Sequence, residues 1–332
     1  MTKRGWSIAT LLLAAAALGA GVWSSYRDAI VRARERSTSG SLIAQTPCGP
    51  IEYSVAGSGP PVLSIHGAGG GFDQGLDIGR PFVESGFRVI APSRFGYLRT
   101  PVPAEASAAA QADAHACLLD ALDVPRAVVI GVSAGAPSAM QLALRHPERT
   151  AALVLVVPAA YVPRPGGAPS LATPPRTPAI FETALRFDFL FWAATRAAPE
   201  TMQRSVLATP PDVLRAASAD EKARVAEILE HLLPVSSRRL GLSNDAAVVS
   251  RLPRYELEKI AAPTLVISVE DDLYGTFEPA RYTAEHVPGA RFVGYPTGGH
   301  LWVGHHREVT AEITEFLCEA EAATDSAAAP PG

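Results

Sequence analysis

The amino-acid sequence predicts an α/β fold built on a doubly wound, mostly parallel sheet. The first observation is that short, continuous runs of apolar and β-branched residues recur, as is typical of strands buried on both faces of a parallel sheet. These runs span residues 61–66, 87–92, 126–132, 152–158, 264–269 and 291–295. The second is that helical patterns lie between several of them, and such alternation of strand and helix favours a doubly wound sheet.

The remaining elements are predicted from local signals. The segments SLIAQT and IEYSVAG flank the turn PCGP, which predicts a hairpin ahead of the parallel strands. In residues 110–124, Ala114, Cys117, Leu118 and Ala121 recur at helical spacing and form one apolar stripe. Further helices are expected near 278–286 and from about 306 to 321.

The alternation divides the chain into a core, an insertion and a tail. Residues 40–159 and 260–318 form the predicted α/β core. Between them, residues 160–259 open with a proline-rich stretch and continue in helical patterns, which indicates a helical cap inserted between two strands. Residues 319–332 contain few bulky apolar residues, and we expect a disordered tail there.

The first 36 residues have a different character from the rest. Lys3 and Arg4 precede 22 uncharged residues, 5–26, which are followed by a basic stretch. That length suffices to span a bilayer, and Trp6 and Trp23 stand near its ends, as interfacial aromatics do. We expect a membrane anchor; a cleaved export signal stays open. Charges on both sides leave the orientation open, and we favour an extracytoplasmic location.

Composition restricts the classes of partner. The chain has 332 residues, a formal net charge of −4 and three lysines, so it lacks the concentrated basic face that nucleic acid requires. The three cysteines are far apart in the sequence, and none belongs to a C-x-x-C motif. This spacing indicates neither a disulfide framework nor a zinc site. A pairing of Cys48 stays open, and Cys117 and Cys318 are expected to be buried apolar residues.

Four separate segments carry residues suited to catalysis. GVSAG, residues 131–135, follows a predicted strand and precedes a helical pattern, the context of a nucleophile elbow at Ser133. VEDD ends the strand at 264–269, GGH follows the strand at 291–295, and HGAGG follows the strand at 61–66. Because the carboxyl ends of parallel strands meet at one edge of the sheet, we expect these segments to converge.

Taken together, the four segments resemble the α/β-hydrolases that carry a helical cap, over about residues 40–318. The resemblance implies that Ser133 is the nucleophile, His300 the general base and then acid, and Asp272 the carboxylate that orients His300. Asp271 is the alternative to Asp272.

The resemblance also implies an oxyanion hole formed by the backbone N–H groups of Ala134 and Ala68, with Gly69 as the next choice. His305 and His306 lie close to His300 in the sequence and are alternative bases.

The function implied is a serine hydrolase that cleaves carboxylic esters of small to medium apolar compounds and needs no organic cofactor or metal. The alternatives are a carbon–carbon bond hydrolase, an aminopeptidase, a lipase, a cofactor-free perhydrolase, or a non-catalytic binding protein. Phe187, Phe191 and Trp192 either line an acyl pocket or pack the cap onto the core. The sequence predicts no oligomeric state.

Overall fold

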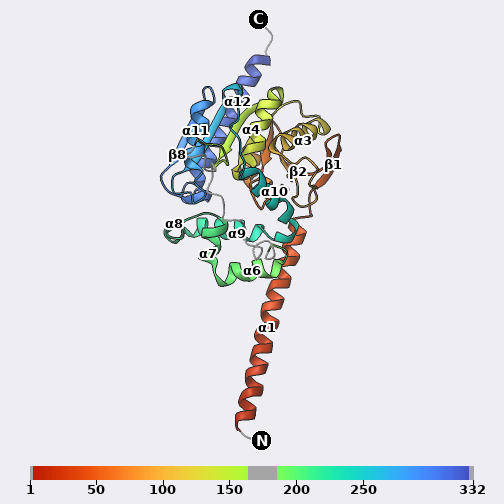
Figure 1. Ribbon diagram of the computed structural model, residues 1–332, viewed down its shortest axis with the longest axis vertical. Helices are drawn as coiled ribbons and strands as arrows, with labels where there is room; N and C mark the ends of the chain where they lie inside the picture. The colour runs from red at the N-terminus through yellow and green to blue at the C-terminus, as the bar shows by residue number, and fades with distance from the viewer. Residues whose placement is uncertain (1–2, 164–184, 329–332) are drawn as a thin grey trace.

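The computed structural model describes residues 3–163 and 185–328 and contains one eight-stranded sheet (Figure 1). The strand order is β1-β2-β4-β3-β5-β6-β7-β8. The strands are β1 Leu42–Thr46, β2 Gly49–Ala56, β3 Pro61–Ile65, β4 Arg88–Pro92, β5 Ala127–Val132, β6 Thr150–Val156, β7 Thr264–Val269 and β8 Arg291–Tyr295.

The sheet is antiparallel at one edge and parallel elsewhere. β1 and β2 form the predicted hairpin, β2 pairs antiparallel with β4, and the pairs from β4 through β3, β5, β6 and β7 to β8 are parallel. Every residue of β5 and β7 is buried, which accounts for their continuous apolar sequence. The predicted fold class is confirmed.

Helices cover both faces of the sheet. α3 (Ala108–Ala121), α4 (Ala136–Arg145) and α11 (Phe277–His286) pack with alternate strand side chains in one hydrophobic cluster. The other face is covered by α2 (Phe72–Glu84) and α12 (His306–Ala328). Because side chains of a strand alternate between faces, each buried strand contributes to both clusters.

Between β6 and β7 the described chain is helical. We call the following five elements the cap helices: α6 Asp188–Ala197, α7 Pro199–Val206, α8 Pro211–Ala216, α9 Ala219–His231 and α10 Arg239–Val249. The proline-rich part of the predicted insertion, 164–184, lies outside the described residues. Phe191 and Trp192 are buried in a third hydrophobic cluster formed mostly by cap residues, whereas Phe187 is 54% exposed.

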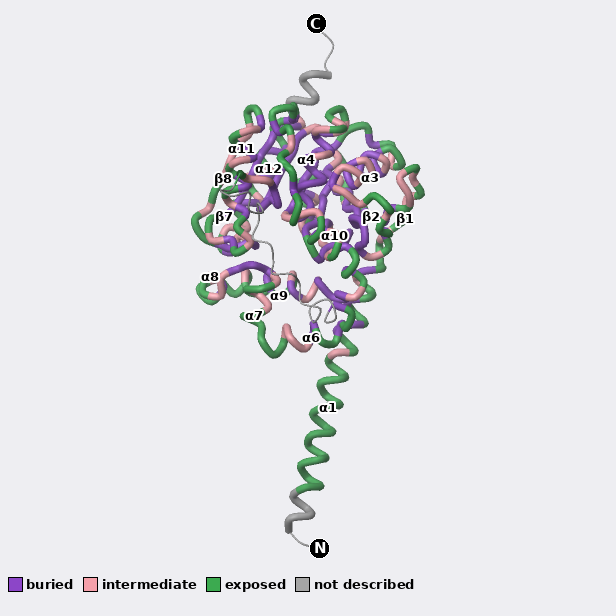
Figure 2. The backbone as a smooth tube through the Cα atoms, in the orientation of Figure 1, coloured by how far each residue is buried: buried purple, intermediate pink, exposed green. Residues whose placement is uncertain are grey.

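The N-terminal helix α1 (Lys3–Arg36) has two halves with different surroundings. Its apolar first part is exposed and projects away from the molecule (Figure 2), and it is long and apolar enough to cross a membrane. Its second part, predicted only as a basic flank, packs against the cap through Ala29, Ile30 and Ala33. These residues are spaced so that they share one helix face.

The C-terminal segment differs from the sequence prediction. Residues 319–332 were expected to be disordered, but α12 continues to Ala328. Alanine and glutamate dominate this stretch, and both have high helix propensity, so a helix that begins on the core continues beyond it. Residues 329–332 lie outside the described chain.

The cysteines also differ from expectation. Cys48 and Cys117 form a disulfide that joins the β1–β2 turn to α3, across 69 residues of sequence. Cys117 is therefore not a free buried thiol, and Cys318 is exposed rather than buried. The spacing of the cysteines does not predict this pairing, because the pairing depends on how α3 packs against the hairpin.

Removing this disulfide is expected to destabilise the chain. A Cys48→Ser/Cys117→Ser variant frees a long loop in the unfolded state, which lowers the free energy of unfolding by about 2–5 kcal/mol. Thermal unfolding of the full chain in detergent measures the loss. Cys318→Ser, which removes an exposed thiol, should leave the midpoint unchanged; an equal loss in both variants would contradict the structural role of the disulfide.

Candidate active site

Ser133 lies on a sharp turn between β5 and α4. Its φ is 51°, a left-handed value that is rare for a non-glycine residue. The turn is possible because its neighbours are glycines: a Cβ at Gly131 would lie 2.6 Å from Ala139 Cβ, and one at Gly135 would lie 2.5 Å from the His66 carbonyl oxygen. The strand, the turn and the helix thus pack too closely for side chains there.

Hydrogen bonds connect Ser133, His300 and Asp272 in series. His300 Nδ1 lies 2.8 Å from Asp272 Oδ2, and His300 Nε2 lies 2.9 Å from Ser133 Oγ. A carboxylate only accepts, so Nδ1–H donates to Asp272 and Nε2 accepts from the serine hydroxyl. Both His300 and Asp272 are buried. The three residues proposed from the sequence are brought together.

The two adjacent aspartates, Asp271 and Asp272, have different hydrogen-bond partners. Asp272 also accepts hydrogen bonds from the Tyr274 backbone N–H, at 2.9 Å, and from the Thr276 hydroxyl. Asp271 points elsewhere and accepts from the Gly299 backbone N–H at 2.7 Å, so it braces the loop that carries His300.

The two alternative bases, His305 and His306, contact residues other than Ser133. The His305 ring stacks on Tyr295 with ring centroids 4.4 Å apart. His306 accepts a hydrogen bond at 3.4 Å from the Trp302 indole. His300 is therefore the histidine that the structure places at the serine.

Tyr274 and the cap constrain the histidine loop. The Tyr274 ring meets the His300 ring edge-on, with centroids 4.8 Å apart, and its hydroxyl donates to the Val206 carbonyl. Burial, with a smaller contribution from Asp272, raises the pKa of Tyr274 to about 12. The Ala208 carbonyl accepts the backbone N–H of His300 at 3.3 Å. Cap residues therefore contact Tyr274 and the loop that carries His300 directly.

The two predicted oxyanion residues come from the serine turn and from the loop that follows β3. Ala134 follows it in the turn and is buried. Ala68 is exposed and belongs to the loop of residues 66–71, which we call the oxyanion loop. A Cβ at Gly67 would lie 3.2 Å from Ser133 Cβ, so this loop passes directly against the serine.

His66 is neutral, and its ring holds the start of the oxyanion loop in place. The Arg94 backbone N–H donates to His66 Nε2 at 3.0 Å, so the proton is on Nδ1, which donates to the Gly67 carbonyl at 2.7 Å. Burial, together with the charge of Arg94, holds the pKa of His66 well below its ordinary value. These contacts give His66 a structural role.

Arg94 binds both the oxyanion loop and the cap. It donates to the carbonyls of His66 and Gly67 at 2.9 and 3.1 Å, and forms a bidentate ion pair with Asp245 of α10 at 2.6 and 2.7 Å. Tyr97 donates to the same carboxylate and accepts the Gly69 N–H. Burial would lower the pKa of Arg94, but Asp245 outweighs it and keeps the pKa above its ordinary value.

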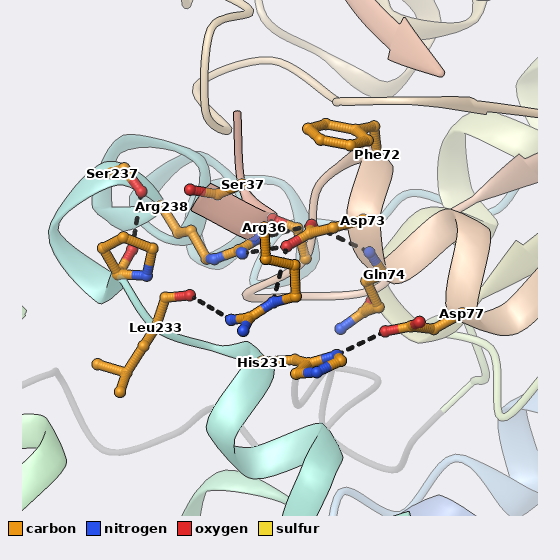
Figure 3. Close-up of polar contacts among 12 residues, drawn as sticks. Arg36, Ser37, Phe72, Asp73, Gln74, Asp77, His231, Leu233, Ser237 and Arg238 are labelled. Carbon is orange, nitrogen blue, oxygen red and sulfur yellow. Dashed lines mark hydrogen bonds and ion pairs between the residues drawn. The ribbon is translucent and has the colours of Figure 1, made fainter. Parts of the chain in front are cut away.

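A second buried ion pair holds the other end of the loop (Figure 3). Arg238, which precedes α10, donates to the Gly70 carbonyl at 2.6 Å and binds both oxygens of Asp73 at 3.1 and 2.5 Å. Burial would raise the pKa of Asp73, but Arg238 outweighs it and the pKa lies below its usual range. Arg36 at the end of α1 lies 3.9 Å from the same carboxylate and donates to the Leu233 carbonyl.

Sequence reasoning did not identify Arg94, Asp245, Arg238 or Asp73. The members of each pair are 151 and 165 residues apart in the sequence, and no short motif contains them. One indirect signal was available: Arg94, two residues after the predicted strand at 87–92, lies at the same edge of the sheet as Ser133.

Within residues 3–163 and 185–328, no group of three or more histidine, cysteine or acidic side chains is arranged to hold a metal ion.

Breaking the Arg238–Asp73 pair on one side is expected to cost stability. Arg238→Met leaves the Asp73 carboxylate buried without its main partner, which lowers the free energy of unfolding by about 3–5 kcal/mol. Arg238→Met/Asp73→Asn should recover part of that loss. The control Arg80→Met removes an exposed ion pair with Asp77 and should change thermal unfolding little. A loss no larger for Arg238→Met than for the control would contradict the assignment.

Comparisons with known proteins identify the same fold. A model of the alpha/beta hydrolase fold family matches residues 60–303. The chain is 28% identical over 283 residues to the uncharacterized hydrolase YcgS of Bacillus subtilis, covering 80% of this chain and 93% of that protein. It is 30% identical over 280 residues to a 2-hydroxy-6-oxononadienedioate/2-hydroxy-6-oxononatrienedioate hydrolase of Paraburkholderia xenovorans, with coverage of 80% and 90%.

Among solved structures, an alpha/beta hydrolase fold protein from Nakamurella multipartita matches with a TM-score of 0.65 and 29% identity, covering 83% of this chain and 98% of that one. Since the family model matches well over half of the residues and includes the serine turn and the histidine loop, this chain belongs to the alpha/beta hydrolase fold family.

Proposed function

We propose that this protein is a serine hydrolase that cleaves carboxylic esters through an acyl-enzyme. The observation that carries the proposal is the hydrogen-bonded series Ser133–His300–Asp272 at the edge of the sheet. A serine hydroxyl attacks a carbonyl only when a base accepts its proton, and His300 Nε2 lies within reach to do so.

The reaction follows from this geometry. Ser133 Oγ attacks the ester carbonyl while its proton passes to His300 Nε2, and Asp272 stabilises the imidazolium that forms. The backbone N–H groups of Ala134 and Ala68 receive the developing oxyanion. His300 then protonates the leaving alcohol, and water activated by His300 hydrolyses the acyl-enzyme.

The charges around the site favour an uncharged substrate. Arg94 and Arg238, which bind the carbonyls of the oxyanion loop, are each neutralised by a carboxylate of their own. A substrate carboxylate gains little from cations that are already paired, because it would have to compete with a desolvated ion pair. This supports an apolar ester as the substrate.

A second candidate function is hydrolysis of a carbon–carbon bond beside a ketone. It is favoured by similarity to relatives named as hydrolases of 2-hydroxy-6-oxo dienoates and dienedioates, at 29 and 30% identity. The same triad serves both reactions, so the two candidates differ in substrate and are separated by comparing substrates in one assay.

We propose further that the hydrolase lies on the extracytoplasmic side of a membrane, held by α1. The Cys48–Cys117 disulfide supports this location, because disulfides persist in oxidising compartments and are rare in the cytosol. The charges on either side of residues 5–26 do not decide the orientation of α1 in the membrane, whereas the disulfide favours the orientation that places the hydrolase outside the cytoplasm.

Ser133→Ala is expected to abolish hydrolysis of p-nitrophenyl esters, with a loss of about 10⁶-fold in kcat, because no other group at the turn supplies the nucleophile. A fluorophosphonate probe should label the wild-type chain and not the variant. Wild-type protein should cleave an ester series faster than a vinylogous diketone dienoate. Faster cleavage of the diketone selects the second candidate, and labelling of the variant refutes Ser133 as nucleophile.

Substituting the two aspartates separately tests their roles. Asp272→Asn removes the carboxylate that orients His300 and stabilises its charge, and should lower kcat by about 10³–10⁴-fold. Asp271→Asn keeps an oxygen that can accept the Gly299 N–H, so kcat should fall by less than about 10-fold. Steady-state kinetics on one p-nitrophenyl ester measures both. A reversed order of effects would assign the triad carboxylate to Asp271.

A further inference from the structure

The first part of α1 presents apolar side chains to the outside. Ile8, Leu11, Leu12, Leu13 and Leu18 are each at least 60% exposed. The helix is long and apolar enough to cross a bilayer. About 20 helical residues cross a hydrocarbon core of about 30 Å, so a span that begins at Gly5 ends close to Trp23–Tyr26.

The second part of α1 is fixed to the cap. Ala29, Ile30 and Ala33 are buried in the cap's hydrophobic cluster. Arg36 donates to the carbonyl of Leu233 at 2.8 Å. Because α1 is one continuous helix, the end of its apolar part sets the height of the cap above a membrane that it crosses.

Aromatic side chains join α1 to α6 near the end of the apolar part of α1. Tyr26 packs edge-on against Phe189 with ring centroids 5.1 Å apart, and lies 5.6 Å from Trp192. Trp23 lies 6.4 Å from Phe189. Tyrosine and tryptophan are enriched where a membrane protein passes from hydrocarbon to water. α6 therefore lies beside the end of the apolar part of α1, as Figure 1 also shows.

The beginning of α6 exposes further apolar surface at this place. Phe187 is 54%, Leu190 48% and Phe189 36% exposed, although Asp188 between them is buried and held by Ser236. The hydrogen bonds between Asp188 and Ser236 fix the orientation of α6, and in this orientation Phe189 and Leu190 face outward. Arg186 and Arg196 are exposed at its two ends, where anionic headgroups would be favourable partners.

We propose that Phe187, Phe189 and Leu190 of the cap, together with Trp23 and Tyr26 of α1, form a lipid-docking surface that enters the headgroup–acyl boundary of the bilayer crossed by α1. The occupant is lipid rather than a protein partner because the surface is continuous with the exposed apolar face of α1. Interfacial segments with aromatic and leucine side chains on one side and arginines at the rim bind membranes in this way.

The test uses environment-sensitive fluorescent labels on the full chain in vesicles of phosphatidylcholine and phosphatidylglycerol. Leu190→Cys and Leu240→Cys are prepared with Cys318→Ser, and each is labelled with a nitrobenzoxadiazole thiol reagent. Leu240 on α10 is the matched control because it is 50% exposed. The native Cys318, exposed on α12, is labelled in the unsubstituted chain as a second control, since α12 and the apolar part of α1 lie at opposite ends of the molecule (Figure 1).

We expect the label at 190 to emit at shorter wavelength and to be quenched several-fold more strongly by doxyl-labelled lipids than the labels at 240 and 318. Equal quenching at the three positions overturns the proposal. A label at Val22→Cys reports insertion of α1, so quenching at 22 without quenching at 190 also overturns it. A blue shift at 190 without quenching, accompanied by energy transfer between protomers, assigns the surface to a second copy instead.

Discussion

Two buried ion pairs that cross between the core and the cap determine the shape of the site. In one the arginine comes from the core and the carboxylate from the cap, Arg94 with Asp245; in the other the order is reversed, Asp73 with Arg238. Each arginine also binds carbonyls of the oxyanion loop. A buried charge left without its partner costs several kcal/mol, so loop and cap hold one another in place.

The core of the chain carries Ser133, Asp272 and His300, and the cap carries residues that hold the surrounding loops. Ser133, Asp272 and His300 all follow strands of the core sheet. The cap contacts the loops around them: Ala208 accepts the N–H of His300 and of Leu273, and Asp245 and Arg238 fix the loop beside the serine. A displacement of about 1 Å in a catalytic group is costly for rate. The cap therefore helps to hold Ser133, Asp272 and His300 in the arrangement that the structure shows.

α1 belongs to the folded domain for part of its length. Its last residues carry a buried stripe, Ala29, Ile30 and Ala33, between exposed arginines, and its final residue reaches Asp73 beside the oxyanion loop. The Cys48–Cys117 disulfide ties the antiparallel hairpin to α3. Both connections attach peripheral segments to the core that carries the site.

The sequence by itself determined the parallel strands, the serine turn and the strand ends that carry Asp272 and His300. These depend on local properties: continuous apolar runs, glycines that allow a tight turn, and the rule that strand ends share an edge. Only the tertiary structure decided between Asp271 and Asp272, paired Cys48 with Cys117, and joined Arg94 to Asp245 across 151 residues. Those contacts depend on packing between distant segments, and one sequence carries no local pattern for them.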